Sequence, residues 1–129
     1  MQQTGTGITQ LGRVIVPVSD QARAKTFYTE TLGFEVRSEV AMGPDYTWLE
    51  VAPRGAVTSI AIVPPPDQSK IGVETGIAFE THDVEASYAT LKAAGVDVDA
   101  EISRMGDPVP PMFWFRDPDG NTLLVAEVS

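Results

Sequence analysis

The fold is decided by residues 14–34, VIVPVSDQARAKTFYTETLGF. The first five of these residues form an apolar run rich in β-branched side chains, which is typical of a buried strand. Asp20 follows as a helix cap, and apolar residues then recur at helical spacing over residues 21–32. Gly33 predicts the end of this helix, and residues 34–37 resume as a strand. The stretch therefore predicts the order strand, helix, strand.

The second half of the chain repeats this order at an interval of roughly 60 residues, the spacing of an internal repeat. Residues 77–81 are strand-like, and Asp83 is the cap candidate of a helix over residues 84–94. Gly95 ends that helix, and residues 96–99 alternate as a strand does. Two units built on one plan are therefore expected.

Each unit continues with two further strand candidates. They are residues 46–52 and 57–63 in the first half and residues 112–116 and 121–128 in the second, with a turn at 117–120. Prolines 64–66 cannot continue a central strand and begin the connection between the units. We expect one domain over residues 1–129, with a βαβββ module at about 11–63, a linker at about 64–75 and a βαβββ module at about 76–128.

Three motifs carry a family resemblance. They are Val16-Pro17-Val18-Ser19-Asp20 with Ala24, Phe27-Tyr28 and Leu32-Gly33-Phe34; Ile77-Ala78-Phe79 with Asp83-Val84, Leu91 and Ala94-Gly95-Val96; and Phe115-Arg116-Asp117-Pro118-Asp119-Gly120-Asn121. In order and spacing the chain resembles the glyoxalase/bleomycin-resistance/extradiol dioxygenase (vicinal oxygen chelate) superfamily from about Leu11 to Val128. The resemblance implies an α+β fold of two βαβββ modules, whose curved mixed sheets enclose a pocket, and it implies a homodimer whose modules can be exchanged between subunits.

Composition narrows the function classes. The net charge of −9 makes the surface acidic, which serves solubility and disfavours nucleic acid as a partner. No cysteine is present, so disulfides and cysteine-ligated metal sites are excluded. No apolar run reaches the length of a membrane span, and residues 1–7 lack the features of a secretory signal. We therefore expect a cytoplasmic protein with no membrane partner.

Alternation along the strands predicts which side chains face the pocket. One face of each strand is uniformly apolar and suited to packing on a helix, so the opposite face is assigned to the concavity. Apolar walls with a few convergent polar groups are typical of a small-molecule site. The alternative is that these side chains only fill the space between the sheets. The candidate ligand-binding residues are Arg13, Ile15, Arg37, Trp48, Glu50, Met112, Trp114 and Leu124.

The resemblance also implies where a metal would be held. Metal-dependent members carry ligands on the first, fourth, fifth and eighth strands, and the matching positions here are Arg13, Ala61, Gly76 and Leu124. None of these side chains suits a divalent metal. His82, the one histidine, lies beside the cap of the second helix, where a surface or capping role is expected. We therefore expect a lost metal site and no cofactor.

Arg13 and Glu50 leave alternatives open. Arg13 either forms an ion pair with Glu50, or binds an anionic ligand group through two hydrogen bonds from its guanidinium, or reaches outward to water. Glu50 in turn could bind a cationic ligand or act as a general base, which makes it the one candidate catalytic residue.

The sequence thus favours metal-independent binding or sequestration of a small aromatic or cationic molecule, as in bleomycin-resistance-type proteins. The alternative is an enzyme of this superfamily, such as a lyase, an isomerase or a dioxygenase-like enzyme. It would work without metal through Glu50 or with a metal site that the motifs do not reveal. Whether any catalysis occurs is left open by the sequence.

Overall fold

The computed structural model describes residues 5–65 and 67–129. Residues 1–4, and Pro66 in the expected linker, lie outside the described residues. The elements are β1 (Arg13–Pro17), α1 (Gln21–Thr26), the π-helical segment η1 (Phe27–Thr31), β2 (Glu35–Gly43), β3 (Tyr46–Ala52), β4 (Ser59–Val63), the short 3-10 helix η2 (Gln68–Lys70), β5 (Glu74–Thr81), α2 (Val84–Ala93), β6 (Asp97–Val98), β7 (Met112–Arg116) and β8 (Thr122–Glu127).

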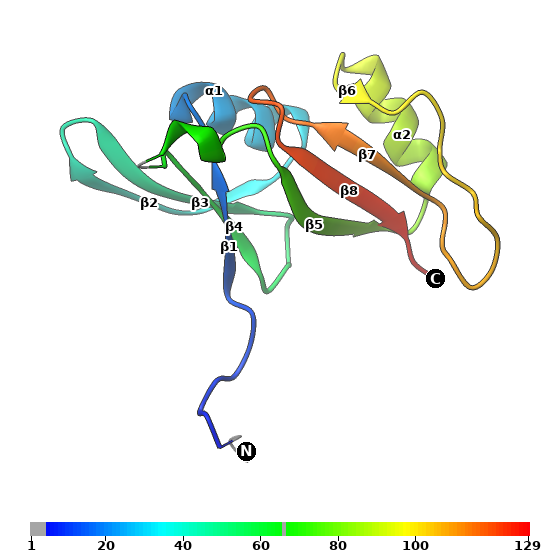
Figure 1. Cartoon of the computed structure of the whole chain (residues 1–129), viewed down its shortest axis with the longest axis horizontal. Coiled ribbons are helices and arrows are strands. Elements are labelled where there is room, and N and C mark those ends of the chain that lie inside the picture. Colours follow the sequence, from blue (N-terminus) through cyan, green and yellow to red (C-terminus); the bar gives the residue numbers. More distant parts are fainter. Residues whose placement is uncertain (1–4, 66) are drawn as a thin grey trace.

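The described strands form two four-stranded sheets with the same topology. The first has the order β1-β4-β3-β2 and the second the order β5-β8-β7-β6. In each sheet the first strand pairs in parallel with the last, and the remaining pairs are antiparallel. The predicted α+β class and the repeated βαβββ plan are therefore confirmed. Figure 1 shows the two sheets side by side.

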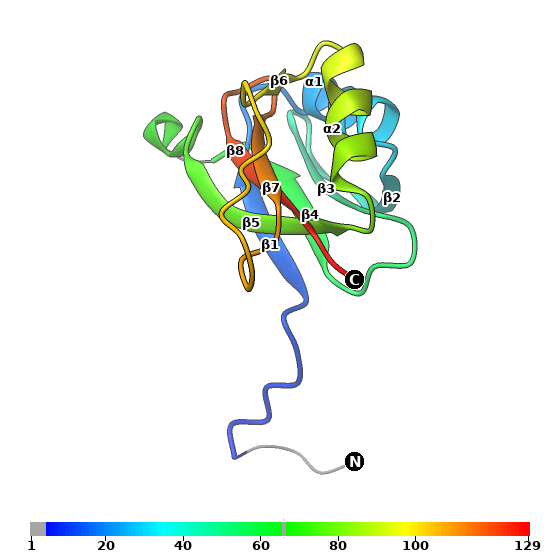
Figure 2. The ribbon, with the colours of Figure 1, turned by 90° about the vertical axis from the view of Figure 1, so that its right-hand side faces the viewer.

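Helices α1 and α2 lie together on one side of the strands, as Figure 2 shows. Between helices and strands lies one continuous hydrophobic core that draws on both modules. The apolar face that alternation assigned to each strand is buried there, including Val16, Leu49, Phe113 and Leu123 at 2 % exposure or less. Burial of these side chains is the main force that holds the modules together. The opposite face of each sheet, called here its outer face, points away from the helices.

The first helix differs from its prediction in its second half. Residues 21–31 are helical as expected, but from Phe27 the chain widens into a π-helix, in which the Leu32 N–H donates to the Phe27 carbonyl at 3.0 Å. Such insertions change which side chains face inward. Here the consecutive residues Phe27 and Tyr28 are both buried.

Several strands differ in length from their predictions, among them β2 and β6. Strand β2 runs to Gly43 instead of ending near residue 37, and β6 has only two residues. The extension of β2 is mostly exposed, so it has no buried face to create an alternating pattern; its pairing with β3 holds it in place. No helix in the described part of the chain is long and apolar enough to cross a membrane.

A buried polar cluster joins the modules at the turn that follows β7. The Asp117 carboxylate accepts hydrogen bonds from the Tyr28 hydroxyl at 2.9 Å and the Asn121 side-chain amide at 3.0 Å. It also accepts from the backbone N–H groups of Asp119 and Asn121. Burial, and then the nearby charge of Asp117, raise the pKa of the Tyr28 hydroxyl far above its usual range. Tyr28 therefore stays a donor to Asp117.

Asn121 completes this cluster, which we call the Asp117 cluster (Asp117, Asn121 and Tyr28). Its amide nitrogen also donates to the Pro17 carbonyl at 2.8 Å, at the end of β1. Its side-chain oxygen accepts from the N–H groups of Gly72 and Val73, just before β5. One fully buried side chain thus ties together the first module, the linker and the second module.

Candidate ligand-binding site

The outer face of the first sheet carries a compact polar cluster around Glu50. The Glu50 carboxylate accepts hydrogen bonds from Arg13 Nε at 3.1 Å, Trp48 Nε1 at 2.7 Å and the Ser59 hydroxyl at 2.5 Å. Strand register explains the convergence, because Arg13 lies opposite Ser59 and Glu50 lies opposite Ala61 in adjoining pairs. We call these four residues, Arg13, Trp48, Glu50 and Ser59, the Glu50 cluster. The ion pair between Arg13 and Glu50 is one of the alternatives that the sequence left open.

Hydrogen bonding fixes the charge of Glu50. The residue is only 8 % exposed, yet the hydrogen bonds from Ser59 and then Trp48 lower the pKa of its carboxyl, and the Arg13 charge adds to the effect. These favourable contacts outweigh burial, which alone would raise that pKa. Glu50 is therefore a stable carboxylate that already accepts three hydrogen bonds.

Beside this cluster lies a groove of about 640 Å³, which we call the outer groove. Its lining is mainly apolar and aromatic, and comes from β1, β3, the end of β4 and the start of the linker. The lining residues are Ile15, Pro17, Tyr46, Trp48, Val63, Pro64, Pro65 and Lys70. Ile15 and Trp48 thus meet in one cavity, as alternation predicted for the outer face.

The predicted ligand-binding residues of the second sheet do not line the outer groove. Met112, Trp114 and Leu124 are half-buried on the outer face of the second sheet, where Trp114 and Leu124 are direct cross-strand partners. Among the described residues no ring contact joins Trp114 to Trp48. Because the sheets lie side by side, their outer faces do not oppose each other within one chain (Figure 1). A sandwich of a ligand between the two indoles is therefore not formed by a single chain.

Arg37 is not part of the outer groove, which corrects its expected position. Arg37 is the unpaired residue of a bulge, because Val36 pairs with Val51 and Ser38 with Glu50. Its guanidinium donates to the carbonyls of Pro53 and Ala56, and also pairs with Glu35. Arg37 thus holds the loop between β3 and β4.

The donor set does not fit a divalent metal. Of the four positions that the resemblance marks, Arg13 carries a cation, while Ala61, Gly76 and Leu124 carry no ligating atom in their side chains. Within residues 5–65 and 67–129, no three His, Cys, Asp or Glu side chains are placed to hold a metal ion. His82 is exposed beside Asp83, the residue that caps α2.

Sequence reasoning missed part of the groove. Tyr46 begins β3 and Lys70 ends the short helix η2 in the linker. Tyr46 shares the parity of Trp48, so alternation could have found it. Lys70 follows a proline-rich segment without periodicity, so no pattern in the sequence connects it to the groove.

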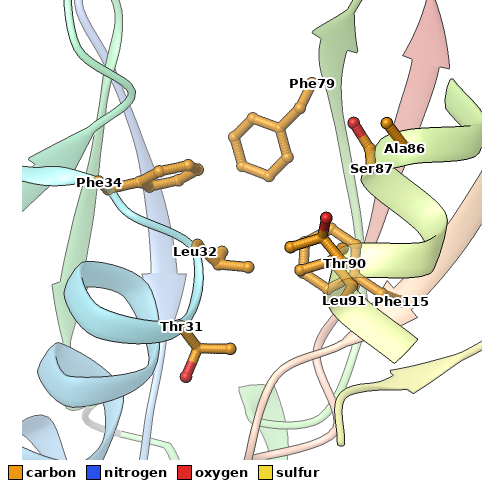
Figure 3. A pocket seen from close by; sticks show the side chains of 9 residues that line it. All are labelled: Thr31, Leu32, Phe34, Phe79, Ala86, Ser87, Thr90, Leu91 and Phe115. Carbon is orange, nitrogen blue, oxygen red and sulfur yellow. The ribbon is translucent and has the colours of Figure 1, made fainter. Parts of the chain in front are cut away.

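A smaller cavity lies on the helix side. It measures about 320 Å³ and opens between η1 and α2, with Leu32 and Phe34 facing Phe79 and Phe115 in Figure 3. Phe34 and Phe79 meet edge to face, with ring centroids 5.3 Å apart. These rings also pack against the shared core, so this cavity is a packing gap where the modules meet.

Known proteins share this architecture. A family model described as the Glyoxalase/Bleomycin resistance protein/Dioxygenase superfamily matches residues 10–125. The protein YetH of Bacillus subtilis (strain 168) is 38% identical over 126 residues, which span 93% of this chain and 99% of YetH.

Two solved structures are similar over nearly the whole chain. A superfamily member from Sphaerobacter thermophilus DSM 20745 is 33% identical to this chain and has a TM-score of 0.83. The matched region spans 94% of this chain and 98% of that protein. TnmS3, an antibiotic binding protein from Streptomyces sp. CB03234, is 37% identical to this chain and has a TM-score of 0.76. The matched region spans 95% of this chain and 98% of TnmS3. Sequence, topology and relatives agree: the chain belongs to the glyoxalase/bleomycin resistance protein/dioxygenase superfamily.

Proposed function

We propose that this protein binds and sequesters a small planar aromatic molecule in the outer groove, without a metal ion. The observation that carries this proposal is the groove itself. It offers about 640 Å³ with a mainly apolar lining and the rings of Tyr46 and Trp48. Cavities of this size and character are typical of small-molecule sites. An aromatic ligand stacked on Trp48 gains roughly 0.5–1.5 kcal/mol beyond the burial of its surface.

The relatives support binding as the activity. TnmS3 is described as an antibiotic binding protein, and it shares 37% of its residues with this chain over 95% of the chain. The superfamily as a whole also contains enzymes, so membership alone does not separate binder from catalyst. The choice between them depends on the site residues.

The chemistry of Glu50 favours binding over catalysis. A general base must accept a proton near neutral pH. The hydrogen bonds of Ser59 and Trp48 lower the pKa of Glu50, and taking up a proton would weaken its contact with Arg13. Glu50 is therefore better suited to holding the site together than to moving protons.

Metal independence has a direct test. The marked positions Arg13, Ala61, Gly76 and Leu124 offer no ligand set, so the purified protein should hold no stoichiometric divalent metal. Elemental analysis after desalting checks this. About one equivalent of nickel, zinc, manganese or iron per chain would contradict the proposal and favour an enzyme of the superfamily.

A second copy of the chain would complete the site. Ile15 on β1 and Val40 and Met42 on β2, the two edge strands of the first sheet, are 59%, 51% and 62% exposed, and exposed apolar side chains favour association. Pairing two copies could place the Trp114 face of one subunit opposite the outer groove of the other. We therefore propose a homodimer. Sedimentation at micromolar concentration should give twice the chain mass of 13.9 kDa, and a monomer alone would contradict it.

The binding proposal is tested with three probes that share one ring system: naphthoate, naphthamide and naphthylmethylammonium. At least one should bind with micromolar affinity in isothermal titration calorimetry, and Trp48→Ala should weaken it at least tenfold, by about 1.4 kcal/mol. Met105→Ala is the matched control, because Met105 is exposed and lines none of the cavities described above. If no probe binds, or if Trp48→Ala binds as the parent does, the outer groove is not the site.

A further inference from the structure

Arg13 retains unused donors at the edge of the outer groove. Its Nε atom donates to Glu50, but neither terminal nitrogen of its guanidinium has a partner within the described residues. The side chain is 55% exposed, so these two nitrogens are open to a ligand. A guanidinium held at one nitrogen presents its remaining donors in a fixed direction, which suits a carboxylate.

Glu50 is much less accessible than Arg13. Its carboxylate already accepts three hydrogen bonds, from Arg13, Trp48 and Ser59, and the residue is only 8% exposed. A ligand cation would have to reach this nearly buried carboxylate and compete with the Arg13 charge. The open donors at the polar end of the site therefore belong to Arg13, and Glu50 acts as the support that orients it.

Trp48 connects the cation to the groove. Its indole nitrogen and Arg13 Nε both donate to the same oxygen of Glu50, at 2.7 Å and 3.1 Å. The guanidinium therefore lies at the edge of the indole, and the indole lines the groove. A planar molecule packed on Trp48 would have a substituent within reach of Arg13.

One cation lines the groove itself. Lys70 is exposed, and no acidic side chain pairs with it among the residues that the structure describes. The charge of Arg13 is balanced by the Glu50 carboxylate, so Lys70 supplies the net positive charge at this groove, although the chain as a whole carries a net charge of −9. A local positive charge of this kind attracts a ligand of negative charge.

We infer that the ligand is a planar aromatic carboxylate, whose ring packs on Trp48 and whose acidic group is bound by the terminal nitrogens of Arg13. This inference rests on the proposed binding function and names its ligand class. Lys70 adds long-range attraction. The open choice between an anionic and a cationic ligand is thereby decided in favour of the anion.

The experiment compares the same three naphthalene probes by calorimetry at neutral pH and low salt. The parent should bind naphthoate about 10- to 100-fold more tightly than naphthamide, the range of a charge-assisted hydrogen bond, and naphthylmethylammonium most weakly. Arg13→Gln should reduce the preference for naphthoate over naphthamide to less than about threefold. Lys70→Gln should lower naphthoate affinity only a few-fold, because an exposed charge is screened.

Arg104→Gln is the matched control, because Arg104 also pairs with a glutamate and is 51% exposed, against 55% for Arg13. It should leave all three affinities unchanged. Added salt should weaken naphthoate but not naphthamide in the parent, which tests the charge without any variant.

The outcomes separate the two proposals. Equal binding of naphthoate and naphthamide, or tightest binding of the ammonium probe, overturns the aromatic carboxylate and leaves the binding function standing. A naphthoate preference that survives in Arg13→Gln also overturns the role of Arg13. If none of the three probes binds, both proposals fall.

Discussion

Asp117 and Glu50 are carboxylates buried in hydrogen-bonded clusters, and they differ in what surrounds them. Asp117 is 5% exposed and Glu50 is 8% exposed. The donors to Asp117 come from Tyr28 and from its own turn, and they are buried or part-buried. The donors to Glu50 include Arg13, which is half-exposed and keeps two free nitrogens.

This difference separates a structural role from a binding role. A polar cluster whose donors and acceptors are all satisfied rigidifies the fold, because any loss leaves a buried group unpaired. The Asp117 cluster is of this kind and joins the two modules. The Glu50 cluster satisfies its carboxylate but leaves a cation at the surface, so it can orient a side chain toward a ligand. Variants in the Asp117 cluster should therefore affect stability more than binding, and variants in the Glu50 cluster should affect binding more than stability.

The largest effect on stability is expected for Asn121→Ala. The change removes a side chain with 0% exposure and leaves the Pro17 carbonyl and the N–H groups of Gly72 and Val73 without their partner. Each unpaired buried group costs about 1–3 kcal/mol, so the free energy of unfolding should fall by about 3–5 kcal/mol. Chemical denaturation measures this fall.

Pro118→Ala is the control for that variant, because Pro118 is exposed in the same turn. It should cost less than about 1 kcal/mol, mainly through the greater freedom of the unfolded chain. A loss below about 1 kcal/mol for Asn121→Ala would show that the Asp117 cluster does not hold the modules together.

A smaller and pH-dependent effect is expected for Glu50→Gln. Because folding lowers the pKa of Glu50 below its ordinary value of 4.5, its carboxylate stabilises the fold fully above pH 4.5. This stabilisation is lost as the pH falls through the lower pKa of the folded state. The variant should be less stable than the parent by about 1–2 kcal/mol at neutral pH. The difference in stability between variant and parent should shrink in acid. Denaturation curves across this pH range measure it, and a difference that stays constant with pH would contradict the prediction.

Tyr28→Phe should cost about 1.5 kcal/mol, the low end of the usual range for a hydrogen bond to a charged group. The Tyr28 hydroxyl is one of two side-chain donors to the same Asp117 oxygen, and the Asn121 amide remains as the other. Thermal unfolding measures the loss, and naphthoate affinity should stay that of the parent. A selective loss of affinity would place Tyr28 in the binding machinery instead.

Much of the fold could be predicted because local patterns and tertiary packing agree. Asp20 and Asp83 cap their helices as expected, each accepting a backbone N–H three residues on. Alternation along β3 predicted that Leu49 and Val51 face the helices and Trp48 the outer face, and Leu49 and Val51 are buried. The contact between Arg13 and Glu50 followed from the same alternation, because strand register brings residues of one face together.

Other features depend on interactions that no local pattern records. Arg37 lies in a bulge of β2, and a bulge is a property of the pairing between two strands rather than of one. The separation of Trp48 from Trp114 depends on how the modules pack, which a repeat does not specify. Lys70 reaches the groove through the path of the linker.

The smallest effect is expected for the coupling between Arg13 and Glu50. Half-exposed ion pairs contribute little, because the solvent screens them and holding a long side chain costs entropy. A double-mutant cycle of Arg13→Gln and Glu50→Gln should therefore give a coupling energy of about 0.2–1 kcal/mol in stability, reduced further by added salt. In naphthoate affinity the same cycle should behave differently. Arg13→Gln alone should remove most of the naphthoate preference, and the second substitution should add little, because Glu50 acts on the ligand only through Arg13. A coupling above about 2 kcal/mol in stability would make this pair a structural element like the Asp117 cluster, and would erase the distinction between the two clusters.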